Sequence, residues 1–171
     1  MKYLLIIIAL LITSFFGTEY RKEAVIESEM ETFKEGSYRV TSVIDGDTII
    51  IDTTSGQEKV RLIGIDTPEV DPNRGGPECY GDEASKYTNE TVLNKSVTIE
   101  PDESQGIRDK YGRLLAYVRL QDDSLLNQTL IAKGFAREYT YKKPYNYQKE
   151  FKIAETSART QEKGLWGTCS N

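Results

Sequence analysis

The sequence predicts an α+β protein built on a small closed β-barrel, and two observations support this prediction. The expected elements follow the order strand, strand, strand, helix, strand, strand, helix and helix. The chain has 171 residues, which favours a single domain with a substantial core. A five-stranded OB-type barrel with three α-helices packed outside it accommodates this order.

Apolar patterning predicts the first three strands. The alternation in "YRVTSVI", from residue 38, predicts one strand, and "TIIID", from residue 48, predicts the next. "TSGQE" is typical of a turn, after which "KVRLIGID", residues 59–66, predicts the third strand. Residues 67–81 are rich in proline and glycine and are expected to form a loop.

A first helix is predicted in "DEASKYTNETVLNK", residues 82–95. Asp82 and Glu83 suit its N-terminus. Ala84, Thr88 and Val92 recur every fourth residue and define one face. The other expected elements are strands at 96–101 and 113–120, helices at 122–134 and 147–164, and a short extended piece at 135–141.

The N-terminus predicts a signal peptide or an N-terminal anchor in residues 1–17. One lysine precedes an apolar run that is shorter than the roughly 20 residues of a transmembrane helix. No clear A-x-A cleavage site follows, so retention as an anchor stays open. A core strand or helix is the alternative, but the charged segment 18–36 fits a polar leader or linker better. We therefore expect a protein that is secreted, or anchored to the outer face of the cell membrane, with its domain at 37–171.

Export makes the two cysteines informative. In an oxidising compartment Cys79 and Cys169 are expected to form a disulfide. The bridge would close a loop of about 90 residues and contribute at most about 4–5 kcal/mol in the chain-entropy model. Two unpaired thiols are the alternative.

The composition excludes several mechanisms. The sequence has no histidine, so no imidazole can serve as base, acid or metal ligand. With only two cysteines besides, a zinc finger or a tetrahedral zinc hydrolase is strongly disfavoured. The net charge of −5 argues against a surface coated with basic residues, but it allows a local basic groove with modest, salt-sensitive affinity for nucleic acid.

Four acidic residues lie at predicted strand ends or in loops, where functional groups are common. They are Asp45, Asp47, Asp66 and Glu69. If these ends converge, they provide oxygen ligands, which favour calcium or magnesium. Taken alone, "DGD" at 45–47 also fits an ordinary turn. An EF-hand in 71–82 is disfavoured because its twelfth position is Asp82 and no helix precedes it.

Arginine, lysine and tyrosine residues suggest a phosphate-binding surface. Arg61 and Arg113 lie on predicted strands and could together clamp a phosphate. Arg61 and Asp66 are five residues apart, so they share a site only if the strand bends or ends near Gly64. "REYTYKKPYNY" interleaves tyrosines with lysines, as base stacking beside phosphates requires, although ordinary tyrosine packing is an alternative.

Five ordered segments together resemble the staphylococcal nuclease (thermonuclease) family. They are "VIDGDT" at 43–48, "RLIGIDTPE" at 61–69, "YGDEAS" at 80–85, "DKYGRLLAYV" at 109–118 and "NQTLIAKGFAREYTY" at 127–141. "KGLWG" at 163–167 is similar to the tail of many bacterial members. The resemblance implies an OB-fold barrel with three helices. We also expect a monomer without a stable protein partner. It also implies calcium-dependent hydrolysis of phosphodiester bonds in DNA and RNA that leaves 3′-phosphates.

The resemblance also assigns roles to individual residues. It implies Asp47, Asp66 and the Thr67 carbonyl as calcium ligands with Asp45 nearby, Glu69 as the activator of water, and Arg61 and Arg113 as the phosphate clamp. Lys110 and Tyr111 match residues that bind a terminal phosphate, and Tyr139 and Tyr141 match residues that line the nucleotide pocket. The alternatives are a catalytically silent nucleic-acid-binding module on the same barrel and a hydrolase of small phosphodiesters.

Overall fold

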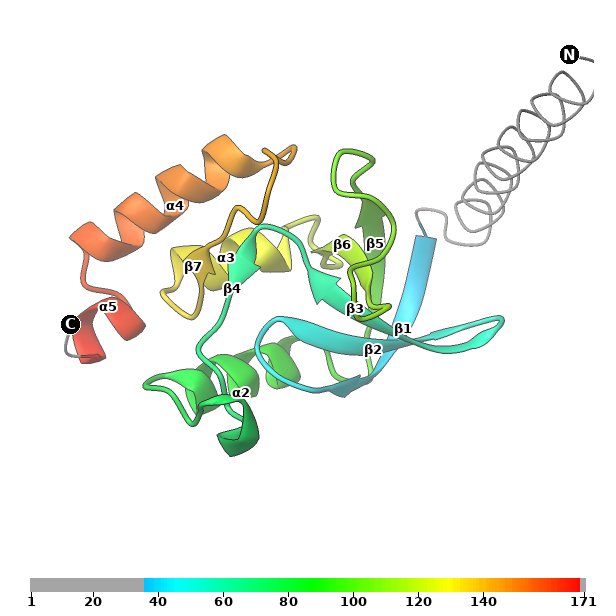
Figure 1. Ribbon diagram of the computed structural model, residues 1–171, viewed down its shortest axis with the longest axis horizontal. Coiled ribbons are helices and arrows are strands. Elements are labelled where there is room, and N and C mark those ends of the chain that lie inside the picture. Colours follow the sequence, from blue (N-terminus) through cyan, green and yellow to red (C-terminus); the bar gives the residue numbers. More distant parts are fainter. Residues whose placement is uncertain (1–35, 170–171) are drawn as a thin grey trace, which may run out of the picture. The chain divides into compact units, whose positions relative to one another are not determined.

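The computed structural model describes residues 36–169, which contain a closed five-stranded barrel (Figure 1). The barrel strands are β1 (Gly36–Val43), β2 (Thr48–Thr53), β3 (Gly56–Leu62), β5 (Ser96–Pro101) and β6 (Leu114–Arg119). Their order around the barrel is β1-β2-β3-β6-β5, and β5 closes onto β1. All pairings are antiparallel except that of β3 with β6. The predicted α+β class and OB-type barrel are confirmed.

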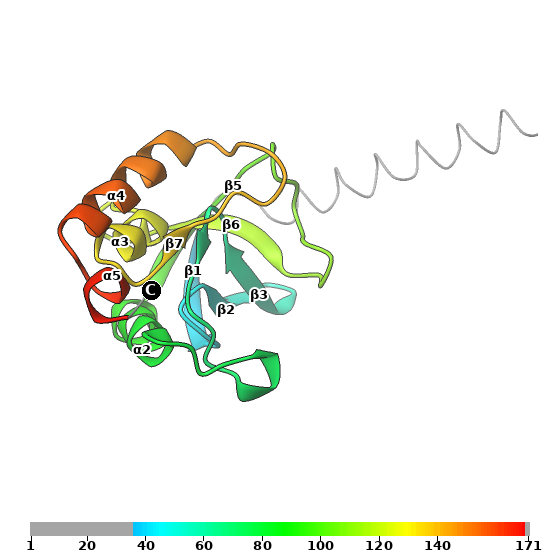
Figure 2. The same ribbon diagram turned by 60° about the vertical axis from the view of Figure 1, so that its left-hand side comes forward.

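The helices pack on one side of the barrel, as Figure 2 shows. They are α2 (Gly81–Val92), α3 (Leu126–Ala132), α4 (Gln148–Thr160) and the short α5 (Leu165–Thr168). Helix α2 contacts β1, α3 contacts β6 and α4, and α4 contacts α5. The predicted stripe on α2 is confirmed, because Ala84, Thr88 and Val92 are all fully buried.

The core fills the barrel and the space under the helices. Branched aliphatic side chains from β2, β3 and β5 are buried in it, among them Ile49, Val60 and Ile99. Phe151 carries the apolar face of α4 into the same core. The remaining elements are a two-stranded ribbon of β4 (Ile65–Asp66) and β7 (Arg137–Glu138) and a short 3₁₀ helix at Pro72–Arg74.

The predicted third strand is in fact two strands. β3 ends at Leu62, and the chain turns at Gly64, whose φ of 78° favours glycine. A Cβ atom at Gly64 would lie 2.6 Å from the ring of Tyr145. The chain then leaves the barrel as β4 and pairs with β7. The break near Gly64 that a shared site requires is therefore present.

Other boundaries also differ from the predictions: β3 begins at Gly56 rather than at residue 59, and α4 ends at Thr160 rather than at residue 164. The helix expected at 122–134 begins only at Leu126, because the Asp122 carboxylate accepts hydrogen bonds from the amide and hydroxyl of Ser124 and so forms a turn. No helix is predicted after residue 164, whereas α5 forms there.

The predicted segments at the N-terminus lie largely outside the described residues. This holds for the signal peptide or anchor at 1–17 and for the linker at 18–36 up to its last residue, Gly36, where β1 begins. Among residues 36–169, no helix has the length and apolar character needed to cross a membrane.

Candidate active site

The turn between β1 and β2 places two buried carboxylates side by side. Asp45 and Asp47 are 6% and 5% exposed. The Asp47 amide donates to the Asp45 carboxylate at 3.1 Å, and the Thr88 hydroxyl of α2 donates to the Gly46 carbonyl at 2.8 Å. Burial and the charge of Asp47 raise the pKa of Asp45 above its usual value.

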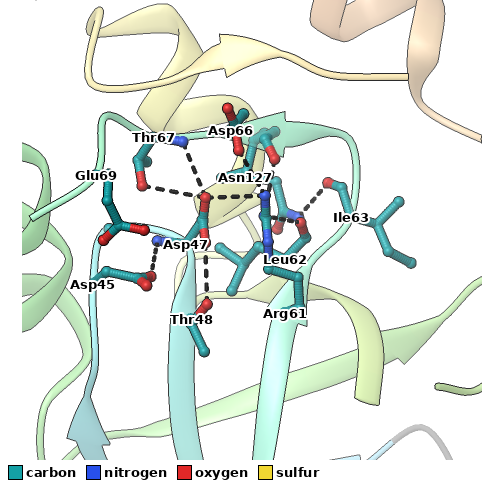
Figure 3. A network of polar contacts seen from close by, with 12 residues as sticks. Asp45, Asp47, Thr48, Arg61, Leu62, Ile63, Asp66, Thr67, Glu69 and Asn127 are labelled. Atoms are coloured by element: carbon teal, nitrogen blue, oxygen red, sulfur yellow. Dashed lines mark hydrogen bonds and ion pairs between the residues drawn. The ribbon is translucent and has the colours of Figure 1, made fainter. Parts of the chain in front are cut away.

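Asp47 is the centre of the polar network in Figure 3. Its Oδ2 accepts hydrogen bonds from the amide and hydroxyl of Thr67, at 3.0 and 3.2 Å. Its Oδ1 accepts from the Thr48 hydroxyl at 3.1 Å. The network therefore joins the β1–β2 turn to the segment after β4, two regions that lie 20 residues apart in the sequence.

Arg61 joins the carboxylates of Asp47 and Asp66. Its Nη2 lies 3.1 Å from Asp47 Oδ2 and 3.0 Å from Asp66 Oδ1. Its Nη1 donates to the carbonyls of Leu62 and Ile65, both at 2.9 Å, so the guanidinium follows the turn that ends β3. Partial burial raises the pKa of Asp66, and the charge of Arg61 opposes this rise.

Glu69 lies on the opposite side of the site from Asp66, and Figure 3 shows its carboxylate on the same side of Asp47 as that of Asp45. The Glu69 Oε1 accepts hydrogen bonds from the amides of Val70 and Asp71, at 2.9 and 3.0 Å. The Glu69 amide donates to Glu78 Oε2 at 3.0 Å, and its carbonyl accepts from the Glu78 amide at 2.8 Å. These bonds fix the backbone that carries Glu69.

Arg113 reaches the site from the position just before β6. Asp109 Oδ2 lies 2.7 Å from both Nε and Nη2 of Arg113, and the Nη1 donates to the Thr48 hydroxyl at 3.4 Å. Hydrogen bonds from the Arg113 amide and side chain and from the Tyr111 amide outweigh burial and lower the pKa of Asp109. Asp109 therefore stays ionised and holds the guanidinium toward the site.

These side chains line one pocket of about 180 Å³. Its lining residues are Asp45, Asp47, Arg61, Asp66, Thr67, Pro68, Glu69 and Arg113. The seven residues predicted for the cation, the water and the phosphate clamp are thus brought together, with Pro68 between them. A pocket with carboxylates and two guanidiniums can bind a cation and an anionic group side by side.

The four predicted nucleotide-binding residues lie outside this pocket but form an exposed cluster. The Lys110 ammonium lies 4.8 Å from the ring centre of Tyr111, and the Arg113 guanidinium lies 5.5 Å from the same ring. The rings of Tyr139 and Tyr141 lie 6.4 Å apart. Hydrogen bonding to Tyr111 and the nearby Tyr141 hydroxyl raise the pKa of Lys110. All three tyrosines among these four residues are more than 40% exposed.

The carboxylate oxygens in the pocket are ligands of the type that a hard cation takes, and they would provide only part of its coordination shell. Among residues 36–169, no group of three or more His, Cys, Asp or Glu side chains is arranged to hold an ion by itself. Asp47 and Asp66 nevertheless contact one cationic atom, the Arg61 Nη2, from two sides. A cation bound by two carboxylates, with water and substrate oxygens as further ligands, matches the coordination of calcium and magnesium.

Sequence reasoning missed three residues that shape the site. The sequence predicts a polar loop around Asp109 and a loop rich in proline and glycine around Glu78, with no role for either carboxylate. The position of Asp109, four residues before Arg113, was a usable signal for their ion pair. Asn127 is fully buried, donates to the Ile63 carbonyl at 2.9 Å and accepts from the Val118 amide at 2.9 Å. It thereby ties the β3–β4 turn to β6.

The predicted disulfide is confirmed. Cys79 and Cys169 are joined, with their Cα atoms 5.9 Å apart and a sequence separation of 90. The bridge fastens the loop that contains Glu78 to the residue after α5.

The fold and the pocket together define the class: an OB-fold barrel of the α+β type whose site combines carboxylates with arginines. The family model of the staphylococcal nuclease homologues matches residues 59–168. The chain belongs to the staphylococcal nuclease family.

Curated relatives agree with this assignment. The chain is 39% identical to the thermonuclease of Staphylococcus hyicus over 132 residues, which cover 77% of this chain and 76% of that protein. It is 41% identical to the thermonuclease of Staphylococcus intermedius over 130 residues, 76% of each chain. It is also 36% identical to endonuclease YncB of Bacillus subtilis over 72% of this chain and 58% of that protein.

Proposed function

We propose that the protein is a calcium-dependent nuclease that hydrolyses phosphodiester bonds in DNA and RNA and leaves 3′-phosphates. The observation that carries the proposal is the pocket in which Arg61 and Arg113 face Asp47, Asp66 and Glu69. The names of the relatives, thermonuclease and endonuclease, support the nuclease reaction.

The two arginines have the chemistry that this reaction needs. A phosphodiester carries a negative charge that repels an attacking oxygen, and the charge increases in the transition state. Guanidiniums that are already held in place stabilise that added charge. The backbone carbonyls of Leu62 and Ile65 hold Arg61, and Asp109 holds Arg113, so both groups are positioned before substrate binds.

Glu69 is the proposed activator of the attacking water. Its carboxylate lines the pocket, and its backbone is fixed by Glu78. A carboxylate in this position can orient a water molecule or accept its proton, which provides a base in a chain without histidine.

Asp47, Asp66 and the Thr67 carbonyl are the proposed ligands of calcium. When bound, the ion supplies positive charge next to the phosphate and lowers the pKa of a coordinated water. Asp45, buried beside Asp47, adds negative charge that favours a cation at this place.

Lys110, Tyr111, Tyr139 and Tyr141 are proposed to bind the terminal phosphate and the nucleotide next to the scissile bond. Their exposure and their mixture of aromatic rings with a cation support this role. We further propose that the protein acts as a monomer after export, either secreted or held at the outer face of the membrane. The disulfide supports an oxidising location.

The proposal is tested by adding calcium or a chelator to purified protein with single-stranded DNA and with RNA. We expect degradation with calcium and none with the chelator.

Glu69→Gln and Arg113→Ala should each lower turnover at least about 100-fold. Glu150→Gln, at an exposed position of α4, controls for the loss of a carboxylate. Fresh protein that binds DNA but leaves DNA and RNA intact with calcium would instead indicate a silent binding module.

A further inference from the structure

Arg137 lies beside the pocket but does not line it. It is directly opposite Asp66 in the antiparallel β4–β7 ribbon. Side chains of directly opposed residues project from the same face of a sheet, with Cβ atoms about 4.5–5.5 Å apart. Arg137 therefore projects from the ribbon on the face that carries Asp66, and its charge contributes to the environment of that carboxylate.

The Arg137 guanidinium is available to a ligand. Its side chain is exposed, and it forms no salt bridge within residues 36–169. Arg61 and Arg113, by contrast, each have a carboxylate partner within 3.1 Å. The contact recorded for Arg137 is with an aromatic ring, because its guanidinium lies 5.6 Å from the ring centre of Trp166.

Trp166 extends this surface away from the pocket. The Arg159 guanidinium lies 3.8 Å from the centre of the same ring. Arg159 also pairs with Glu155 at 3.3 Å, which orients it from one side. Arg137 and Arg159 each place a guanidinium near the half-buried Trp166 ring, so this surface combines an aromatic group with positive charge, the combination that binds single-stranded nucleic acid.

The arrangement continues a row of residues that leads from the nucleotide cluster. The Tyr139 amide donates to the Gly64 carbonyl at 3.0 Å, so the extended pairing of β7 continues to Tyr139. Alternate residues of an extended segment share one face at intervals of about 6.6–6.8 Å. A strand of nucleic acid that follows β7 therefore meets Tyr139, with Tyr141 beside it, then Arg137 and then Trp166.

We propose that Arg137, Trp166 and Arg159 form an additional subsite for the polynucleotide. It binds a phosphate next to the scissile one, on the Asp66 side of the pocket. This inference rests on the proposed nuclease function, and it specifies a polymer rather than a small phosphodiester as the substrate. It also explains how a chain with net charge −5 binds nucleic acid, because the positive groups are concentrated along the site.

The subsite is tested by binding measurements in chelator at low salt, where the strand stays intact. The probe is a fluorescein-labelled single-stranded DNA of about 12 nucleotides, a length in the range that one OB fold contacts. Anisotropy gives Kd for the wild type, for Arg137→Gln and for Lys152→Gln, an exposed α4 residue whose change removes the same charge. Trp166 is the one tryptophan of the sequence, so tryptophan fluorescence measured with unlabelled DNA reports on the proposed subsite alone.

We expect Arg137→Gln to weaken binding about five- to tenfold and to lower the slope of log K against log salt by about 0.7. Lys152→Gln should change Kd less than about twofold, and Trp166 emission should change along the same curve as the anisotropy. Equal effects of the two variants, unchanged emission at saturation, or no binding to the probe would each overturn the subsite. Calcium-dependent cleavage, measured separately on the wild type, decides the proposed function independently of these results.

Discussion

At the scale of single residues, the site depends on the contacts that stabilise the Asp47 carboxylate although the Asp45 carboxylate is buried beside it. Asp47 accepts hydrogen bonds from Thr48 and from the amide and hydroxyl of Thr67, and it contacts Arg61. Hydrogen bonds and an opposite charge offset the cost of burying a charged group. The pair of acids in "DGD" is therefore part of a polar network and not an isolated surface turn.

Asp109 is predicted to be a positioning residue that acts through Arg113. Asp109→Asn removes the charge that holds the guanidinium at 2.7 Å, so Arg113 should lose its fixed direction. We expect kcat to fall about tenfold, less than in Arg113→Ala. The kinetics of both single variants and of the double variant check this.

The double variant separates positioning from a general structural effect. If Asp109 acts through Arg113, the double variant should be about as slow as Arg113→Ala alone. If instead the two losses in kcat multiply, each substitution keeps its full effect in the presence of the other. That result would show that Asp109 acts independently of Arg113.

At the scale of elements, the turn between β3 and β4 depends on Asn127 of α3. Asn127→Ala leaves the Ile63 carbonyl and the Val118 amide without this partner in a buried place. We expect the free energy of unfolding to fall by about 2–4 kcal/mol. Urea denaturation measures this, with Thr129→Ala as the control, since its hydroxyl donates only locally, to the carbonyl of Leu125 at the N-cap of α3. A loss below that of the control would contradict the role given to Asn127.

The loop between β4 and α2 is held at two points, by the hydrogen bonds of Glu78 to Glu69 and by the disulfide of Cys79. A bridge across 90 residues contributes up to about 4–5 kcal/mol. Reduction should therefore lower the melting temperature by about 10 °C, and it should lower activity at temperatures where the protein stays folded. A melting temperature that is the same with and without reductant would contradict this.

At the scale of the whole molecule, the sequence predicted most of the barrel because its strands and α2 have strong local patterns. The break in the third strand was predicted only as a requirement for Arg61 and Asp66 to share a site. The sequence could not show more, because the close packing of Tyr145 against Gly64 exists only in the folded chain. The late start of α3 follows from a local bond of Asp122, and α5 is too short to show a period. Asp109, Glu78 and Asn127 act through contacts set by the folded chain, which spacing in the sequence does not reveal.

The dependence of stability on pH also belongs to the whole molecule. Asp102 is 1% exposed, and burial raises its pKa, but hydrogen bonds from Asn146, Tyr117 and Ser104 outweigh this and lower the pKa below the usual value. A carboxyl with a lowered pKa in the folded state contributes stability that is present above its unfolded pKa of about 3.9. That contribution is lost as the pH falls through the folded pKa.

Urea denaturation at several pH values tests this behaviour. The difference in unfolding free energy between the wild type and Asp102→Asn should be largest above about pH 5 and should shrink as the pH falls below about 4. A difference that stays constant from pH 6 to pH 3 would show that ionisation of Asp102 does not contribute to stability.

The proposed mechanism requires Asp47 and Asp66 to share a cation, and isothermal titration with calcium tests this most directly. Asp66→Asn is the variant to compare, because the Asp66 side chain is 53% exposed and its change should leave the fold intact, as a thermal melt can verify. We predict that the wild type binds calcium with measurable heat and that Asp66→Asn weakens the affinity at least about tenfold. Equal affinity in the two proteins, or no binding to the wild type, would contradict the account.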